Sequence, residues 1–467
     1  MKVNLSNIGL IEDATVQIDG LTVIAGLNGT GKSTIGKTIY SLVSAVENLQ
    51  EISLTDRLQY TYSKLRNIFE KFVPLYYALR NVKNSESSNP ILHFFMNTRH
   101  TCLDSLIDSL EMLRVYVEEL TQPNYENLIK NMTGIDTPKR LLVEHWNSKS
   151  DVIIVINNVL KSLRSDPKLQ RYANKRIQIT LNTVFNDQIP PQKQKSEKSE
   201  SHIKVHDSNK TYFDVVLNKG KINGQKTAYL SKWLDNAILI DNPYAVDKLS
   251  EKTVLRNDFS SHVHNEDDFD EQITIEPPEE SLRRKLKSET KSIFESIIRE
   301  EQAVEILNLI SDAFSDEITL SDGEYVVGPE KLNIKNLATG VKLFAIIKTL
   351  ITKGYIKENT LLVLDEPESH LHPEWQNQLA EIIALLVKKS NVKVVLTTHS
   401  AHFMIAIDAM MRKYQIGDIT NFYFNTKIED SQMVSVKCVN DELETIYSEF
   451  LSPYAKMYDL KEKLRKG

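Results

Sequence analysis

Residues 26–33, with the sequence Gly-Leu-Asn-Gly-Thr-Gly-Lys-Ser, have the residue types and the spacing of a P-loop. Its glycines allow backbone N–H groups to approach a phosphate closely, which side chains at those positions would prevent. Lys32 would then reach the β- and γ-phosphates, and the Ser33 hydroxyl would ligate Mg²⁺. We therefore predict a binding site for a nucleoside triphosphate with Mg²⁺.

The segments on both sides of this loop have the patterns of the elements that must position it. Residues 21–25 are mostly apolar and predict a buried strand. After the loop, apolar residues recur at helical spacing, at Ile35, Ile39, Leu42, Val43, Val46 and Leu49. A strand, a glycine-rich loop and a helix direct N–H groups and the positive helix end at one point, where an anion binds. A chance match to the motif would not account for both flanks.

A second chemical landmark lies far downstream, where the apolar run of residues 360–364 ends in two carboxylates. Asp365 could belong to the Mg²⁺ shell, and Glu366 could polarise an attacking water. Lys32 and Asp365 are 365 − 32 = 333 residues apart, which is long for one uninterrupted nucleotide-binding domain. We therefore expect an insertion between the two halves of the site.

Two further segments contain candidate ligand-binding residues, one at the end of a predicted strand and one at the start of a predicted helix. The apolar strand predicted before His399 carries this residue to its carboxyl end, where open α/β sheets bind ligands. A lone histidine is more often a structural hydrogen-bonding group, but the order of elements here predicts contact with the γ-phosphate. Ala338, Thr339 and Gly340 precede a predicted helix and could form an anion seat, although an ordinary helix cap would have the same residues.

These patterns predict an α/β fold with a P-loop, split by a helical insertion. Within the insertion, Leu106, Leu110, Leu113 and Val117 have helical spacing, but no heptad continues long enough for a coiled-coil arm. The expected parts are an N-lobe (1–48), a helical insertion as a short bundle or coiled-coil stub (49–186), a mobile linker (187–210), returning head strands (211–250), an acidic loop with a helix (251–309), a C-lobe (310–430) and a C-terminal strand with a helical tail (431–467).

Composition limits the classes of protein that need to be considered. Two cysteines among 467 residues cannot form a disulfide framework, and neither a signal peptide nor a membrane-spanning apolar run is recognisable, so we expect a cytoplasmic protein. The net charge of −6 argues against a globally basic nucleic-acid binder. Residues 161–210 nevertheless contain 11 Lys/Arg and 5 Asp/Glu, a net charge of 11 − 5 = +6. They form either a patch for phosphates or acidic surfaces, or a solvated helix face with a loop.

Histidines and carboxylates also occur together between residues 262 and 271. Their spacing is irregular, so we interpret the segment as a solvated acidic loop rather than a metal site.

Taken together, the motifs resemble the ABC-type ATPase heads of SMC, RecF and OLD-like proteins. The resemblance is carried by residues 4–9, the P-loop, the Leu-Asp-Glu-Pro-Glu-Ser-His-Leu-His-Pro stretch at 364–373 and Thr-Thr-His-Ser at 397–400. It covers roughly residues 1–48, 211–250 and 310–430, and it does not extend to the helical insertion. The resemblance implies the fold of a P-loop ABC-type ATPase head, with a mixed sheet and flanking helices. It also implies ATP hydrolysis with Mg²⁺ between two heads that enclose two ATP molecules.

The resemblance also implies a role for individual residues. Asp365 would be the Mg²⁺ partner together with Ser33, Glu366 the general base and His399 the switch histidine. Residues 369–372 would form the D-loop, and Asn242 is the candidate for the Q-loop position. The Walker A contacts would come from Asn28, Gly29, Thr30, Gly31, Lys32, Ser33 and Thr34.

One motif departs from this family. Its signature is commonly Leu-Ser-Gly-Gly or Leu-Ser-Ser-Gly, whereas residues 337–340 read Leu-Ala-Thr-Gly. The hydroxyl of Thr339 stands one position later than the usual serine, and Ala338 occupies the serine position. Contact with the nucleotide of a second head could still be made through Thr339, Gly340 and backbone N–H groups.

Among such heads, the nearest likeness is to the PtuA ATPase subunits of Septu anti-phage systems, with the ATPase subunits of PARIS systems second. This likeness implies a dimer or higher oligomer that controls a separate nuclease, of the HNH type or else the Toprim type, with DNA as a further partner and no membrane. We expect no nuclease centre in this chain, because no paired Asp-x-Asp follows His399. The alternatives are a DNA-repair ATPase of the RecF or SMC kind and, less favoured, the nucleotide-binding subunit of a transporter.

Overall fold

The structure is a computed structural model that describes residues 1–73, 90–96, 103–133, 138–164, 169–189, 200–223, 228–229, 232–249, 273, 275–288, 304–311, 318–321, 324–327, 332–336, 338–429 and 431–466. The chain forms two units. The first, which we call the sheet unit, consists of Met1–Asn48, Ala173–Phe259 and Ile275–Gly467. The second, the helical unit, consists of Leu49–Tyr172 and Ser260–Thr274.

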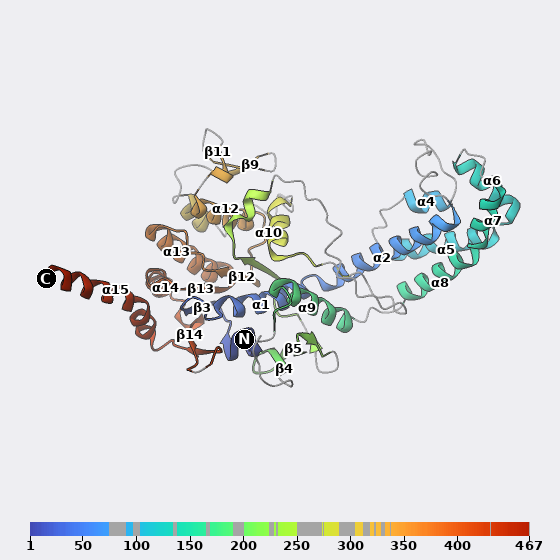
Figure 1. The fold of residues 1–467 in the computed structure, drawn as a ribbon. Helices are drawn as coiled ribbons and strands as arrows, with labels where there is room; N and C mark the ends of the chain where they lie inside the picture. The colour runs from blue at the N-terminus through green and yellow to red at the C-terminus, as the bar shows by residue number, and fades with distance from the viewer. Residues whose placement is uncertain are drawn as a thin grey trace. The chain divides into compact units, whose positions relative to one another are not determined.

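A mixed sheet runs through the sheet unit (Figure 1). The order of its described strands is β6–β5–β4–β1–β2–β15–β14–β3–β13–β12–β8, and β7 pairs with β5. The strands are β1 (Lys2–Ile8), β2 (Ile11–Gln17), β3 (Leu21–Gly26), β4 (Glu200–His206), β5 (Thr211–Asn218), β6 (Lys221–Ile222), β7 (Ala228–Tyr229), β8 (Asn236–Ile240), β12 (Thr360–Asp365), β13 (Lys393–Thr398), β14 (Thr420–Lys427) and β15 (Val434–Cys438).

Five neighbouring strands of this sheet, β14, β3, β13, β12 and β8, are parallel. Strand β12 lies between β8 and β13, so that Leu364 is in register with Ile240 and Leu396. The side chains of β8, β12 and β13 are buried almost throughout, which explains why their sequences are mostly apolar. Because the strands are parallel, the residues that follow β3, β12 and β13 all emerge at the same edge.

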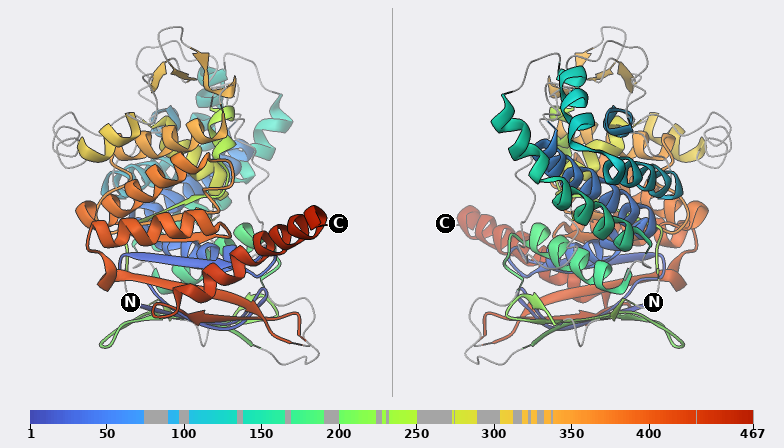
Figure 2. Two further views of the ribbon diagram at one scale, coloured as in Figure 1. Left: turned by 90° about the vertical axis from the view of Figure 1, so that its left-hand side faces the viewer. Right: turned by 90° about the vertical axis from the view of Figure 1, so that its right-hand side faces the viewer.

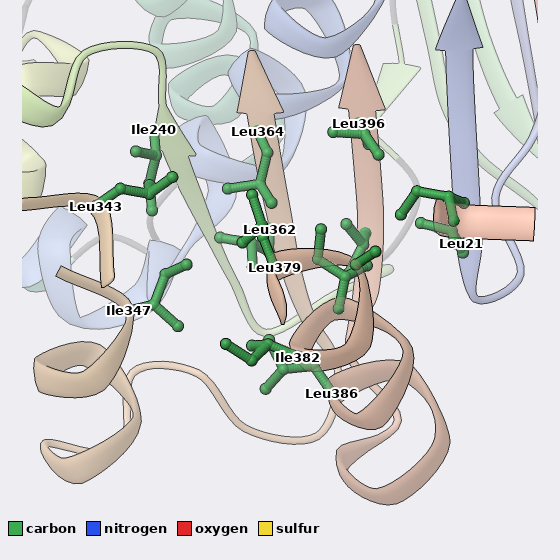
Figure 3. Close-up of a cluster of buried hydrophobic side chains, with 14 of the residues drawn as sticks. Leu21, Ile240, Leu343, Ile347, Leu362, Leu364, Leu379, Ile382, Leu386 and Leu396 are labelled. Atoms are coloured by element: carbon green, nitrogen blue, oxygen red, sulfur yellow. The ribbon is translucent and has the colours of Figure 1, made fainter. Parts of the chain in front are cut away.

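Helices pack on this parallel region. On one side, α12 (Thr339–Thr352) and α13 (Pro373–Ser390) contribute to the apolar cluster in Figure 3, in which Leu343, Ile347, Leu379, Ile382 and Leu386 accompany strand residues such as Leu362. Another helix, α1 (Lys32–Val46), lies so close to β12 that a Cβ at Gly36 would stand 2.8 Å from Val363 Cγ1. Glycine at this position therefore allows the helix that begins at Lys32 to pack directly on the strand that ends at Asp365.

Strands β1, β2, β4 and β5 pair antiparallel and have one buried face. Strand β4 corrects the prediction of a mobile linker over residues 187–210. Ser201, Ile203 and Val205 are buried and alternate with more exposed residues, and Ile203 pairs with Leu5 of β1. The period of two was present in the sequence, but the charged and histidine residues on the other face made the segment resemble a linker. Residues 190–199 of that predicted linker lie outside the described residues.

The sheet unit also contains smaller elements and further helices, which Figure 2 shows from two sides. They are α9 (Leu169–Phe185), α10 (Pro278–Lys287), α14 (Ala401–Lys413), α15 (Leu443–Lys466), the 3₁₀ helices η1 (Pro243–Lys248), η3 (Ile334–Asn336) and η4 (Gly417–Ile419), and the small sheet of β9 (Ile318–Ser321), β10 (Glu324–Val327) and β11 (Leu332–Asn333). Helix α15 packs at its start through Ile446 and Phe450, whereas side chains further along it, such as Tyr458, are exposed.

The helical unit has an apolar core of its own. It contains α2 (Leu49–Phe72), α4 (Pro90–Met96), α5 (Leu103–Glu119), α6 (Gln122–Thr133), α7 (Lys139–Asn147) and α8 (Lys149–Arg164). Leu106, Leu110, Leu113 and Val117 form the buried face of α5, at the helical spacing seen in the sequence. Aromatic rings also contribute to this core, including Phe69, Phe72, Phe94 and Tyr125.

The boundary between the units falls inside α9, between Tyr172 and Ala173, and not at residue 186 as the sequence suggested. Arg176 explains the difference, because its Nε donates to the carbonyl of Ala45 at the end of α1. Gln178 similarly donates to the carbonyl of Gly220. Arg176 is one of the basic residues between 161 and 210, but only 5% of it is exposed. It therefore contributes to packing and does not belong to a basic surface patch.

Residues 262–271, interpreted from the sequence as a solvated acidic loop, lie outside the described residues. None of the helices in the described part of the chain combines the length and the apolar character needed to span a membrane.

Candidate active site

The P-loop joins the end of β3 to the start of α1. Gly29 and Gly31 have φ values of +74° and +69°, a left-handed conformation that glycine adopts without steric cost. Thr30 is buried, and its hydroxyl donates to the carbonyl of Leu27 at 2.7 Å, which closes the loop. Asn28 is exposed beside Gly29, and Thr34 lies in the first turn of α1. This loop therefore presents its backbone at the positive end of α1.

Lys32 is the first residue of α1, and its side chain turns back across the loop. Its ammonium donates to the carbonyl of Leu27 at 3.0 Å and lies 3.1 Å from Glu366 Oε1. The side chain is only 4% exposed, so these oxygens replace the water that would otherwise solvate the charge. Lys32 is thus fixed between the P-loop and the turn that follows β12.

Ser33 meets the first of the two carboxylates. Its hydroxyl donates to Asp365 Oδ1 at 2.8 Å, and the Thr397 hydroxyl donates to the same oxygen at 2.6 Å. The Thr397 oxygen also accepts from the backbone N–H of Glu366 at 2.9 Å. A hydroxyl beside a carboxylate is a hard oxygen donor set of the kind that Mg²⁺ prefers, so Ser33 and Asp365 fit this cation.

Glu366 adopts a left-handed backbone conformation, with φ of +47°. Such a conformation is unfavourable for a side chain larger than glycine and is concentrated at functional sites. One carboxylate oxygen faces Lys32, and the other lies 3.3 Å from His399 Nδ1 without hydrogen-bond geometry. The structure therefore brings together Lys32, Glu366 and His399, three residues that the sequence placed in one site.

A pocket of about 280 Å³ opens beside these groups. Ser33, Asp365 and Glu366 line it on one side, and Asn242, Thr339 and Gly340 line it as well. The Asn242 side chain accepts from the backbone N–H of Tyr244 at 2.9 Å and caps η1, so its oxygen is held within its own turn. Asn242 thus lies in the same pocket as the carboxylates.

The predicted anion seat forms the start of α12. Ala338 is the N-cap residue but offers no capping side chain, and Leu337 lies outside the described residues. The Thr339 hydroxyl is 2.9 Å from the Tyr244 hydroxyl. A Cβ at Gly340 would lie 2.6 Å from the ring of Trp375. The start of α12 is therefore bound to η1 and to α13 on its two sides.

The turn from β12 to α13 contains the residues predicted to form a D-loop. Ser369 N donates to the carbonyl of Glu366 at 3.1 Å, and Leu371 N to that of Glu368 at 3.0 Å. His372 caps α13, and Pro373 is the first residue of this helix, where a backbone N–H is not needed.

Sequence reasoning missed several polar side chains that support the site. Glu368 is 2% exposed and accepts from the Thr398 hydroxyl and from the backbone N–H of His399. Its burial raises the pKa of its carboxyl group, although these hydrogen bonds act in the opposite direction. Asn425 on β14 is buried behind the P-loop and donates to the carbonyl of Thr30 at 2.8 Å. The double threonine before His399 was visible in the sequence, but its partners were not.

Lys342 and Asp247 form another support that the sequence did not indicate. The Lys342 ammonium is nearly buried, lies 2.7 Å from Asp247 Oδ2 and stands 4.8 Å from the centre of the Tyr244 ring. This pair joins α12 to η1 beside the hydroxyl contact of Thr339 with Tyr244.

The family described as AAA ATPase domain matches residues 1–404 of this chain. None of the curated proteins matches its sequence. The SMC head domain from Thermotoga maritima is 11% identical with a TM-score of 0.36, over 94% of this chain and 98% of that chain. The Smc head domain with a coiled coil and joint from Pyrococcus yayanosii is 10% identical with a TM-score of 0.34, over 97% and 99%. These structural likenesses are distant, and the family match carries the assignment.

Proposed function

The chain belongs to the AAA ATPase domain family, and on that premise we propose that it binds ATP with Mg²⁺ at the P-loop and hydrolyses it. The observation that carries this proposal is the convergence of the P-loop with the two carboxylates that follow from β12. Together they supply a cation, a hydroxyl and two carboxylates at one point. Phosphoryl transfer to water needs groups of these kinds to position the phosphates and the nucleophile.

We assign each residue a role from its place in this arrangement. Residues 28–31 would contact phosphates through their backbone N–H groups, together with Thr34, and Lys32 would hold the β- and γ-phosphates. Ser33 and Asp365 would hold Mg²⁺, which neutralises charge on the phosphates when it is bound. Glu366 would accept a proton from the attacking water, and His399 would donate to the γ-phosphate from the other side of Glu366.

We further propose that two copies of the chain pair around ATP. Thr339 and Gly340 at the start of α12 would contact the γ-phosphate held by the second copy, through one hydroxyl and the N–H groups of a helix N-terminus. The Tyr244 hydroxyl supports this role because it holds the Thr339 hydroxyl in place. Asn242, in the same pocket, would respond to the nucleotide of its own copy.

At the level of the cell, we propose that ATP-dependent pairing controls a separate nuclease subunit in anti-phage defence, with the nuclease of HNH type favoured over Toprim type. Support comes from the likeness of the motifs to Septu and PARIS ATPase subunits. The helical unit adds support, because it has its own apolar core and offers a module for protein contact that the P-loop chemistry does not need.

The experiment that tests this role is purification of tagged Glu366→Gln protein from its native host with ATP present, followed by mass spectrometry. Glu449→Gln is the matched control, because Glu449 is an exposed glutamate on α15. A nuclease recovered in fixed ratio with Glu366→Gln, in an ATP-dependent manner, is the expected result. DNA-repair factors without a nuclease would instead favour a RecF- or SMC-like repair ATPase that acts on DNA. Recovery of an integral membrane protein would favour a transporter subunit.

A further inference from the structure

Glu368 is the most deeply buried carboxylate beside the candidate site, and the roles proposed above do not use it. It lies two residues after Glu366, in the turn from β12 to α13, and its side chain is 2% exposed. A carboxyl group removed from water loses much of its hydration, and hydrogen bonds within the protein must compensate for that loss. The partners of Glu368 indicate what it holds.

Among the described residues, the hydrogen bonds to the Glu368 side chain come from the segment that carries His399. Glu368 Oε1 accepts from the Thr398 hydroxyl and, at 3.2 Å, from the backbone N–H of His399. The Thr398 oxygen in turn accepts from the backbone N–H of Ser400 at 3.1 Å. One carboxylate oxygen therefore fixes three consecutive residues around the histidine.

These contacts begin where the sheet no longer holds the strands together. In the ladder between β12 and β13, Asp365 and Thr397 are the last paired residues. At this point, the Thr397 hydroxyl of β13 also makes hydrogen bonds with Asp365, at the end of β12, and with Glu366, which follows it. Glu368 provides the next link, at the level of His399. Side chains thus continue the connection that backbone hydrogen bonds make within the sheet.

The consequence is the position of the His399 ring. Its Nδ1 lies 3.3 Å from Glu366 Oε2 but has no hydrogen bond among the described residues. The contact with Glu366 therefore does not hold the ring in place, and the position of the ring depends on the backbone of His399. Glu368 is the side chain that holds this backbone.

We infer that Glu368 is a positioning residue for ATP hydrolysis, which holds His399 at the distance from Glu366 that the reaction needs. The inference rests on the roles proposed for Glu366 and His399. It assigns Glu368 to the chemical step and not to ATP binding, because its hydrogen bonds among the described residues go to Thr398 and His399 and not to the P-loop.

The test compares two substitutions of Glu368 by steady-state hydrolysis of ATP. Glu368→Leu removes both acceptor contacts, and we expect kcat to fall about 10- to 100-fold, since displacements near 1 Å have effects of this size. KM for ATP should stay within about twofold of wild type, because the P-loop is unchanged. Glu368→Gln keeps a carbonyl oxygen that can accept both hydrogen bonds, and it should restore most of the lost rate.

Folding and site assignment are controlled separately. Thermal unfolding of each variant identifies a change caused by loss of structure, and Thr398→Val is the second variant if Glu368→Leu does not fold. Thr398→Val removes one donor while keeping side-chain shape, and a smaller fall in kcat alone is expected. Wild-type kcat in both Glu368→Leu and Thr398→Val would overturn the inference, as would a rise in KM that accounts for the whole effect.

Glu366→Gln and His399→Ala are measured in the same assay. If they retain wild-type hydrolysis, the proposed roles of Glu366 and His399 are wrong. If they lose hydrolysis while Glu368→Leu does not, only the role of Glu368 is wrong.

Discussion

The Lys32 ammonium and the Glu366 carboxylate form an ion pair, with Nζ 3.1 Å from Oε1, that joins the P-loop to the turn after β12. Lys32 is almost fully buried, whereas Glu366 is 32% exposed. The two side chains restrain each other, because Lys32 has no other ionic partner among the described residues. Phosphates that enter the site would compete with Glu366 for Lys32, so the two residues are expected to respond differently to substitution.

Glu366→Gln is expected to separate ATP binding from hydrolysis. The amide keeps the shape of the side chain but cannot accept the proton of an attacking water, so kcat should fall about 10²- to 10⁴-fold. Binding of ATP should persist or strengthen, because Lys32 loses an anionic competitor. Phosphate release measures the rate, and light scattering after size exclusion measures ATP-dependent pairing. Glu449→Gln should behave as wild type in both. Without an ATP-dependent increase in mass for Glu366→Gln, pairing around ATP would be wrong.

Lys32→Ala should weaken ATP binding itself. Hydrogen bonds to charged groups contribute about 1.5–3 kcal/mol, so the dissociation constant for ATP should rise about 10-fold or more. Isothermal titration with ATP and Mg²⁺ measures the change. Lys413→Ala is the matched control, since this lysine is 55% exposed and pairs with Glu381 away from the P-loop. If the chain has the proposed role in anti-phage defence, Lys32→Ala should abolish protection against phage in cells, and retained protection would mean that ATP binding is dispensable for it.

The residues that were expected to lie close together, and that do so in the structure, belong to local sequence patterns. The P-loop has a fixed spacing, Asp365 and Glu366 end an apolar run, and His399 follows another. Parallel strands bring such ends to one edge regardless of their separation in the chain, so Lys32 and Glu366 could be placed together from sequence.

The supporting contacts could not be predicted, because nothing in local spacing specifies them. Asn425 donates to the carbonyl of Thr30 across 395 residues, and the partner is a backbone atom that any residue type would offer. Glu368 looked like part of a turn, and only the register of β12 with β13 puts it beside Thr398. Strand β4 was hidden because its polar face carries His202 and Lys204, which made a half-buried strand resemble a linker.

Gly340→Ala is expected to destabilise the sheet unit. The added Cβ would lie 2.6 Å from the Trp375 ring and 2.8 Å from Leu371 Cδ2, and overpacking of this kind costs about 1–3 kcal/mol. Alanine favours a helix over glycine by at most about 1 kcal/mol, so the clash should dominate. The midpoint of urea unfolding measures the effect. Gly417→Ala is the control, because nothing lies within 4 Å of a Cβ there. Equal midpoints for the two variants would contradict the close packing of α12 on α13.

Glu381 should make stability depend on pH in the acid range. Burial acts to raise the pKa of Glu381, but hydrogen bonds from Lys413 and from the Tyr414 hydroxyl outweigh it, and the pKa is lowered in the folded protein. A lowered carboxyl pKa stabilises the fold above the unfolded pKa, which is about 4.3 for glutamate. That stabilisation is lost as the pH falls through the folded pKa, because both states then bind the proton.

Glu381→Gln is therefore expected to lower the free energy of unfolding by about 1 kcal/mol near neutral pH. The difference from wild type should shrink as the pH falls below about 4, since wild-type Glu381 is then protonated as well. Urea unfolding at a series of pH values measures both curves. Glu449→Gln has no such pair among the described residues and should run parallel to wild type. If the deficit of Glu381→Gln stayed constant down to acid pH, its cause would be the altered packing of α13 against α14 and not the charge of Glu381.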